Sequence, residues 1–388
     1  MTREATVLLI SFVLGLSLLD CRHGPSSAVP PKPPLPTASS AGDTTKTTAC
    51  VDAAGGGSNV GTVVAAATAF RDALPDGLRA TLQHPLTRAT AIVWSNLPVK
   101  LVPRTGVRLG DLDAAQSAAV RRLFAAATTT CGLAMLDEVR LSDDVLATVD
   151  KRGLKWGAGN FYVAFLGAPS ERAPWILQIG GHHLAYNFTF NGERAGATPL
   201  FFGTEPTRFT TADGATHEPL REQSAAMIAL AQAIAARPAA RLSGKFTDVV
   251  KGVVINFPPG QPPTGGLDTA FPLNYPTGTS DRGIRVDALS SDEQALVRRA
   301  IESYASLPAQ SIAGDLLKAY EAPAAFGQTY VGCAGGADLS KVGTYVRIDG
   351  PRGWMEFVVQ DGIAFPDKPH YHALWRDKES DYGGEAKQ

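Results

Sequence analysis

The sequence has no excess of charge of either sign. Its 388 residues include 36 Lys and Arg against 37 Asp and Glu, which leaves a net charge of −1. Proteins that bind nucleic acid carry a basic face or stripe, and this chain has no dense block of Lys or Arg. An acidic interaction tail is missing as well. We therefore expect no nucleic-acid partner, while the hydrophobic content of 44% is typical of a globular protein.

The common catalytic motifs are also missing. The sequence contains no G-x-S-x-G nucleophile elbow, no Walker loop, no H-E-x-x-H helix, no EF-hand loop and no C-x-x-C pair. The sequence therefore offers no motif that would assign the protein to one of the corresponding reaction classes.

The apolar run at the N-terminus is too short for a comfortable membrane span. Arg3 precedes the run from Ala5 to Leu19, whose length of about 15 residues suits the core of a signal peptide. The run leads directly into Cys21, which resembles a bacterial lipoprotein signal, in which such a cysteine is lipidated. We expect residues 1–21 to direct export and Cys21 to carry a lipid anchor. Ordinary cleavage near Ser27-Ala28 is the alternative.

Residues 22–50 are rich in Pro, Ser and Thr. The run Pro30-Pro31-Lys32-Pro33-Pro34 favours polyproline II, and the rest of the stretch cannot build a core. We expect a disordered tether between the membrane and a folded domain over residues 51–388.

Cysteine is scarce. The four cysteines are Cys21, Cys50, Cys131 and Cys333, and no two of them have the spacing of metal ligands. If Cys21 is lipidated, three remain in an oxidising compartment, so one disulfide and one unpaired thiol are expected. The sequence does not decide which two of the three form the bond.

The hydrophobic periodicity changes along the domain from helical to strand-like. Because helical and strand segments are segregated, we expect a single integrated α+β domain with a helical N-terminal part and an antiparallel β-meander in the C-terminal part. Helices are expected over residues 60–74, 114–128, 141–149, 222–236, 291–306 and 311–321. Strands are expected over residues 161–166, 175–179, 184–190, 345–348, 354–359 and 370–375.

Capping residues and breakers refine these boundaries. Asp113 with Gln116 three positions later predicts a capping box, and Ser291 is expected to cap the helix that follows it. Gly180-Gly181 is expected to break a strand. Residues 257–283 are dense in Pro and Gly, and we expect a long irregular loop there that is a candidate lid.

Histidines are few, but four of the seven form two close groups, His182-His183 and His370-x-His372. Residues i and i+2 of a strand share a face, so His370 and His372 would present two imidazoles side by side. His182 and His183 would point oppositely in a regular strand, so that one could bind a metal while the other orients or packs. The preceding Gly180-Gly181 could also bring both rings round to one side.

These two groups predict a site for one transition metal ion. Neutral imidazoles with one carboxylate suit Zn, Cu, Fe or Ni, and the sequence does not choose among them. A further ligand is expected from His217-Glu218 or from Glu222. Glu222 and Asp377 are also candidates for orienting an imidazole or acting as a base. Interpretations without a metal remain open. In these, the histidines bind an acidic ligand, act as acid–base groups, or are polar strand residues with their hydrogen bonds satisfied.

The hairpin over residues 345–359 has two contrasting faces. An apolar face is expected from Val346, Ile348, Met355, Phe357 and Val359. A mixed aromatic and charged face is expected from Tyr345, Arg347, Asp349, Trp354 and Glu356. The mixed face is either exposed or covered by an Arg347–Glu356 ion pair, or else it is a ligand-contacting wall where Arg347 or Arg376 grips a carboxylate or phosphate.

Several segments together resemble a known family. They are WILQIGGHHL at 175–184, TPLFFG at 198–203 with Glu205-Pro206, YVRIDGP at 345–351, and HYHALWRD at 370–377 with DYG at 381–383. With these segments the chain resembles the domain of unknown function 3500 family from about Trp94 onward. The resemblance implies one integrated domain and carries no established activity. Its most specific parts contain the same two histidine groups.

Two functions of different classes fit these patterns. The first is an exported metal-dependent enzyme, a hydrolase or an oxidoreductase, with the grouped histidines as ligands. The second is a non-catalytic lipoprotein that binds a small ligand or partner through the mixed face of the C-terminal sheet. Only the first requires the two histidine groups to lie within a few ångströms of each other.

Overall fold

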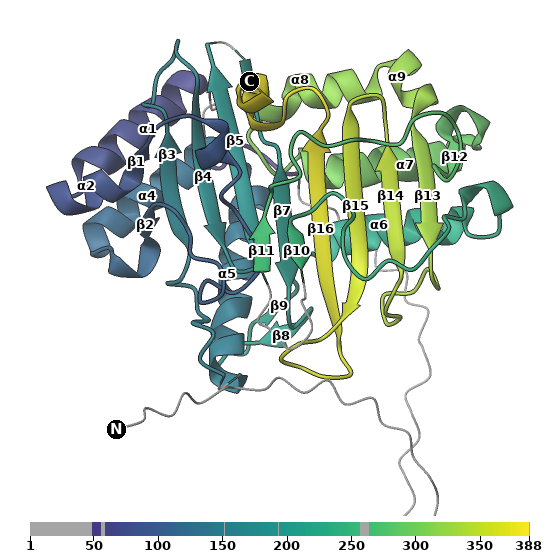
Figure 1. The fold of residues 1–388 in the computed structure, drawn as a ribbon, viewed down its shortest axis with the longest axis horizontal. Coiled ribbons are helices and arrows are strands. Elements are labelled where there is room, and N and C mark those ends of the chain that lie inside the picture. The colour runs from purple at the N-terminus through teal and green to yellow at the C-terminus, as the bar shows by residue number, and fades with distance from the viewer. Residues whose placement is uncertain (1–48, 56–58, 151, 193, 257–263, 388) are drawn as a thin grey trace, which may run out of the picture. The chain divides into compact units, whose positions relative to one another are not determined.

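A twelve-stranded sheet runs through the described part of the chain, which comprises residues 49–55, 59–150, 152–192, 194–256 and 264–387 of a computed structural model (Figure 1). All its strand pairs are antiparallel except the pairing of β1 with β3. The predicted signal peptide, Cys21 and nearly all of the tether lie outside the described residues.

The strand order brings the middle and the end of the chain together. In order across the sheet the strands are β1 (Gln83–His84), β3 (Tyr162–Leu166), β4 (Trp175–Gly181), β5 (Leu184–Asn191), β7 (Leu200–Thr204), β16 (Pro369–Asp377), β15 (Gly353–Asp361), β14 (Tyr345–Asp349), β13 (Tyr330–Ala334) and β12 (Ile284–Arg285). Off this path, β2 (Val107–Arg108) pairs with β3 and β6 (Arg194–Gly196) pairs with β5. The last strand of the chain, β16, thus lies beside β7 in the middle of the sheet.

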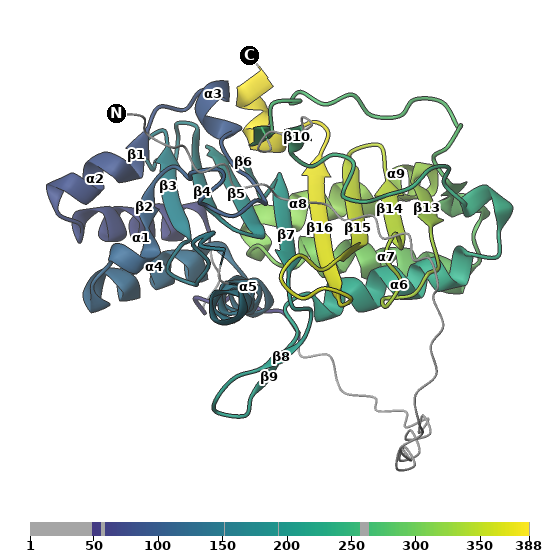
Figure 2. The same cartoon turned by 60° about the horizontal axis from the view of Figure 1, so that its bottom comes forward.

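The two faces of the sheet are covered differently, as Figure 2 shows: most helices lie on one side, and α3, β10 and long irregular connections lie on the other. We call these the helix face and the cover face. The helices are α1 (Val60–Asp72), α2 (Asp76–Leu82), α3 (Arg88–Ala91), α4 (Ala114–Ala127), α5 (Thr130–Val149), α6 (Arg221–Ile234), α7 (Ser291–Ala305), α8 (Gln310–Glu321) and α9 (Pro323–Gln328). No helix in the described ranges is long and apolar enough to cross a membrane.

The predicted α+β class is confirmed, with the helix-rich part first and an antiparallel meander at the C-terminus. The capping box at Asp113 is also confirmed, because its carboxylate accepts from the Gln116 backbone N–H at 2.8 Å while the Gln116 side chain accepts from the Asp113 N–H. The predicted cap at Ser291 is wrong by one residue. Ser290 caps α7, and the Glu293 carboxylate reciprocates.

The short helix predicted over residues 141–149 is wrong, because it is the second half of the 20-residue helix α5. Gly132 lies in the first turn of this helix. A Cβ at that position would lie 2.0 Å from the Leu307 backbone oxygen. The glycine therefore reflects close packing against the residues that follow α7, and it does not end the helix.

The hairpin faces were predicted correctly, but the mixed face is not exposed. Val346, Met355 and Phe357 pack in the core beneath the helices. On the cover face Tyr345, Trp354 and Glu356 are completely buried. The exposed alternative is wrong because an irregular segment lies over this face.

The segment over residues 246–251, which we call the cover segment, is held by a buried carboxylate of the sheet. Glu356 accepts from the backbone N–H groups of Val250 and Lys251, the latter at 2.9 Å, and from the Tyr345 hydroxyl at 2.8 Å. The Phe246 ring stacks on the Tyr345 ring with centroids 4.0 Å apart. A buried carboxylate requires several donors, and the cover segment supplies two of them.

Part of the predicted loop over residues 257–283 can be located. Residues 257–263 lie outside the described residues. The remainder begins with β11 (Thr264–Leu267), which pairs with β10 (Val254–Asn256), and is otherwise irregular. Two short strands, β8 (Phe209–Thr210) and β9 (Thr216–His217), form a separate hairpin.

The structure shows which two cysteines form the disulfide. Cys50 and Cys131 are bonded, and Cys333 is a buried free thiol. The bond ties Cys50, the last residue of the predicted tether, to the start of α5 across a sequence separation of 81.

Removing this disulfide should lower the stability of the domain. For a loop of this length the loss of loop-closure restraint in the unfolded chain corresponds to about 4 kcal/mol. We expect Cys50→Ser with Cys131→Ser to lower the free energy of unfolding by about 2–4 kcal/mol in a denaturant titration. Cys333→Ala is the control, and an effect as large as that of the double variant would contradict this assignment.

Candidate metal centre

His182 and His183 form a two-residue turn between β4 and β5. Gly181 is paired with Leu184, so the predicted strand break at Gly180-Gly181 is wrong and the chain reverses one residue later. His183 has a backbone φ of 58°, in the left-handed region that such tight hairpin turns use. A Cβ on Gly181 would lie 2.4 Å from the Phe161 ring, so this position excludes a side chain.

A half-buried arginine, Arg104, holds this turn in place. The Arg104 guanidinium donates to the Gly181 carbonyl at 2.9 Å and to the Ser95 carbonyl at 2.8 Å. Burial lowers the pKa of Arg104 to about 10, because its charged form is removed from water. The turn is therefore fastened to residues 95–104 on the cover face.

His370 and His372 lie on β16 and both project from the cover face, as their i, i+2 spacing predicts. Between them and the turn runs β7, in which Gly203 is paired with His372. A Cβ on Gly203 would lie 2.8 Å from the His372 Cδ2 atom and 3.1 Å from the His183 Cδ2 atom. Because Gly203 has no side chain, it leaves space above β7 in which His183 of the turn meets His370 and His372 of β16.

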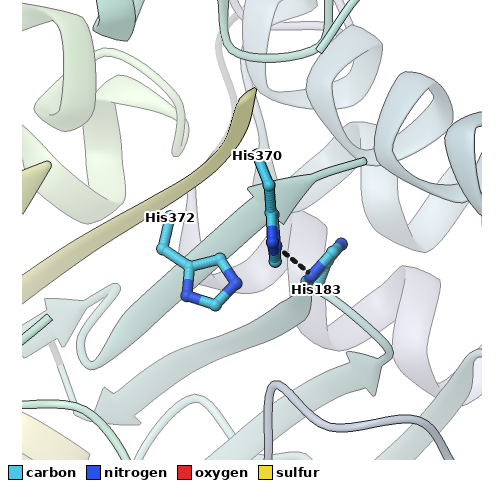
Figure 3. A group of neighbouring side chains, drawn as sticks. All are labelled: His183, His370 and His372. Carbon is cyan, nitrogen blue, oxygen red and sulfur yellow. Dashed lines mark hydrogen bonds between the residues drawn. The ribbon is translucent and has the colours of Figure 1, made fainter. Parts of the chain in front are cut away.

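Three imidazoles form one buried group (Figure 3). His183, His370 and His372 each offer a ligand atom within 4.8 Å of the other two, and all three residues are buried. The Nε2 atoms of His183 and His370 are 2.8 Å apart. The structural requirement of the metal-enzyme hypothesis, proximity of the two histidine groups, is therefore met.

The electrostatics of the group favour neutral rings. Burial lowers the pKa of His183 and of His370 well below the usual value, and the neighbouring imidazoles add to this effect. With both rings neutral, one Nε2 donates its proton to the other across the 2.8 Å contact. Neutral imidazole is the form that binds metal ions.

Two ring nitrogens of the group are buried without a hydrogen bond to any described residue, Nδ1 of His183 and Nε2 of His372. The His370 ring has a backbone partner in Asp361. The other nitrogen of His372, Nδ1, lies 2.7 Å from a carboxylate oxygen of Asp248 and 2.8 Å from the Gln360 amide nitrogen. A carboxylate can only accept, so the contact with Asp248 places the ring proton on Nδ1, and the Gln360 amide nitrogen, a donor, cannot bond the same Nδ1 in that tautomer. His372 then presents an unpaired Nε2 lone pair, as a metal ligand does.

His182 lies next to this group and makes different contacts. Its Nδ1 is 2.7 Å from a carboxylate oxygen of Asp143 on α5, whose other oxygen accepts from the Gly157 N–H at 2.8 Å. The ring packs at a tilt between Trp156, with centroids 4.4 Å apart, and His183, with centroids 3.6 Å apart. Of the two adjacent histidines, His183 joins the group and His182 supports it.

A further buried carboxylate, Glu205, directly follows β7, the strand that runs between the two histidine groups. It accepts from the backbone N–H groups of Ala364 at 2.7 Å and Phe365 at 2.9 Å, which belong to the connection between β15 and β16. Sequence reasoning did not identify Asp143 or Asp248 as partners of the histidines, because both are far from the histidine groups along the chain. It named Glu205 only as part of a family segment.

The other predicted site residues lie apart from the histidine group. Glu222 is on α6 against the helix face, with a side chain 54% exposed and an ion pair to Arg299. His217 lies on β9 near Glu138 and Thr211. The structure therefore brings neither Glu222 nor the His217-Glu218 pair to the centre.

Asp377, Arg376 and Arg347 serve buried contacts elsewhere in the sheet. Asp377 faces the helices and accepts from the Tyr320 hydroxyl at 2.9 Å. Arg376 forms ion pairs with Asp268 at 2.8 Å and Asp381 at 2.9 Å. Arg347 donates to the Asp281 backbone carbonyl and lies over the Trp354 ring. In these contacts with other described residues, neither Arg347 nor Arg376 has a guanidinium free to bind a ligand.

One family model matches nearly all of the described chain. The model, described as "Protein of unknown function (DUF3500)", matches residues 56–384. The chain belongs to the DUF3500 family. No curated protein and no solved structure matches it. The matched range of this DUF3500 chain contains every histidine of the candidate centre, so the centre lies within the family domain.

The lowered pKa values of His183 and His370 predict acid sensitivity of the metal-free DUF3500 domain. Unfolded histidine has a pKa of about 6.5, so below that pH the unfolded state binds protons that the folded state excludes. The free energy of unfolding should therefore fall as the pH decreases from about 6.5, by up to about 2.7 kcal/mol per pH unit for two such histidines.

Denaturant titrations of chelator-treated protein between about pH 7.5 and about pH 5.5 measure this slope. His370→Gln removes one titrating ring and should reduce the slope by up to about half. Equal slopes for the wild type and His370→Gln would contradict the assigned shifts.

Proposed function

We propose that this protein is a metal-dependent enzyme whose centre is one transition metal ion held by His183, His370 and His372. The observation that carries the proposal is the convergence of three buried imidazoles whose ligand atoms lie within 4.8 Å of one another. Two of their ring nitrogens, Nδ1 of His183 and Nε2 of His372, have no hydrogen-bond partner among the described residues. Leaving such a buried group unpaired costs about 1–3 kcal/mol, and an ion bound at His372 Nε2 would offset this cost there.

The ligand set narrows the chemistry. Neutral imidazoles suit Zn, Cu or Fe, and three protein ligands leave a coordination position for water or substrate, which is typical of catalytic sites. A metal held there would supply Lewis-acid catalysis or electron transfer. The reaction classes that we propose are accordingly hydrolysis and oxidoreduction.

The protein's own residues have supporting roles in this proposal. Asp248 keeps the His372 ring proton on Nδ1, and Asp143 orients His182 against His183. The Glu205 carboxylate fixes the connection before β16, which carries the other two histidines. Burial of all three ligands excludes bulk water from the centre.

Metal content tests the centre directly. Wild-type protein reconstituted with Zn, Cu or Fe should retain about one ion per chain. His183→Ala, His370→Ala and His372→Ala should each weaken binding by more than the roughly 10–100-fold that loss of an outer hydrogen-bonding partner costs. At a free metal concentration of 100 times Kd, binding should raise the free energy of unfolding of the wild type by about 2.7 kcal/mol. A thermal-shift measurement should detect this as a higher Tm.

His84→Ala, a histidine outside the group, is the matched control and should bind like the wild type. A wild type without stoichiometric metal, or three variants that bind undiminished, would overturn the proposal. Because zinc is redox-inert, turnover by the zinc form in a panel of hydrolytic assays identifies a hydrolase. Turnover only by the copper or iron form with dioxygen identifies an oxidoreductase.

We also propose that the protein is exported and anchored through a lipid on Cys21. The short apolar run before Cys21 and the tether of residues 22–50 support this proposal. The Cys50–Cys131 disulfide supports it too, because such bonds persist mainly in oxidising compartments.

Fractionation of a bacterial host tests the anchor. The full-length protein should appear in the membrane fraction, while Cys21→Ser should move to the soluble fraction because the thiol that receives the lipid is missing. Cys333→Ser, which leaves Cys21 in place, is the control. Equal release of the wild type and Cys21→Ser into the soluble fraction would refute the lipid anchor.

A further inference from the structure

The cover segment touches the candidate centre at one residue, Asp248. Its carboxylate oxygen lies 2.7 Å from His372 Nδ1 and also accepts from the Val249 N–H at 2.7 Å. The Asp248 side chain is 38% exposed, whereas the His372 side chain is 5% exposed. Asp248 therefore reaches from the surface down to the buried histidine group.

The residues after Asp248 are fastened to neighbouring strands. Val250 and Lys251 donate their N–H groups to Glu356 on β15, and the Lys251 carbonyl accepts from Arg376 Nε on β16 at 2.7 Å. Val249 is buried in the apolar cluster of the cover face. The cover segment thus has two attachments, one to the sheet around Glu356 and one to the histidine group through Asp248.

We infer that Asp248 is a positioning residue that couples the seating of the cover segment to metal binding at the centre. This inference rests on the proposed metal centre. When Asp248 accepts the His372 Nδ1 proton, the Nε2 lone pair faces His183 and His370, and the ring cannot rotate without breaking that bond. A metal bound to His372 Nε2 fixes the His372 ring, and this in turn favours the position in which Asp248 contacts Nδ1. The two effects are reciprocal, because metal binding and the seating of Asp248 change each other's equilibrium by the same factor.

The coupling predicts two measurable effects of Asp248→Ala. Affinity for Co²⁺ or Zn²⁺ should fall by about 10–100-fold, and the absorption spectrum of the Co²⁺ form should change. The reason is that only Gln360 then remains beside His372 Nδ1, and its amide N–H favours the tautomer whose proton lies on Nε2. Hydrogen exchange of residues 246–251 should slow on metal loading in the wild type, and this metal-dependent difference should disappear in the variant.

Two further variants separate positioning from a general effect on structure. Asp248→Asn keeps a neutral oxygen acceptor of the same shape, so it should recover the Co²⁺ spectrum and show an affinity between those of the wild type and Asp248→Ala. Asp315→Ala removes a fully solvated aspartate from α8 and should behave like the wild type in every measurement. If Asp248→Ala does not fold, a wild-type affinity in Asp248→Asn overturns the inference.

The outcomes distinguish the inference from the proposed function. If the wild type binds no stoichiometric Co, Zn, Cu or Fe ion, both fail. If the wild type binds metal, but Asp248→Ala has the same affinity and spectrum, the positioning role is refuted and the metal centre stands. If the spectrum changes while exchange of residues 246–251 is the same with and without metal, the coupling is refuted.

Discussion

The candidate centre depends on a close approach across a single strand. Neighbouring strands lie about 4.8 Å apart, so side chains from the two sides of β7 can meet only where β7 itself carries no side chain on that face. Gly203 provides this gap, and any Cβ there would collide with both His372 and His183. The two-residue turn then aims His183 into the gap from one side, while the strand alternation of β16 places His370 and His372 on the other.

Burial gives these imidazoles their chemical character. Removed from water and placed beside one another, His183 and His370 are held neutral, and Nδ1 of His183 and Nε2 of His372 lack a hydrogen-bond partner among the described residues. Carboxylates act on the outer sides of the group, where Asp248 bonds His372 and Asp143 bonds His182. Neutral imidazoles with carboxylates on their outer sides suit a cation better than an anionic ligand.

The cover face is closed by irregular backbone instead of helices, and buried carboxylates hold that backbone in place. Glu356 binds the N–H groups of the cover segment, and Glu205 binds those of the connection before β16. Asp268 and Asp381 share the buried Arg376 guanidinium. Burial raises the pKa of Asp381 to about 6 in spite of that partner. Among the described residues, the aromatic and charged face of the C-terminal hairpin is therefore packed beneath irregular backbone.

The sequence by itself determined the α+β class, most helices and strands, the two faces of the C-terminal hairpin and the shared face of His370 and His372, because these follow from local periodicity and capping. It placed Gly180-Gly181 as a break and Ser291 as a cap incorrectly, since each boundary depends on which neighbouring residue finds a partner. Only the tertiary structure decided the Cys50–Cys131 pairing, the choice of His183 over His182 and the presence of Asp248 at the centre. These are contacts between residues far apart in the chain. Strand order and packing set them, and local sequence patterns carry no information about either.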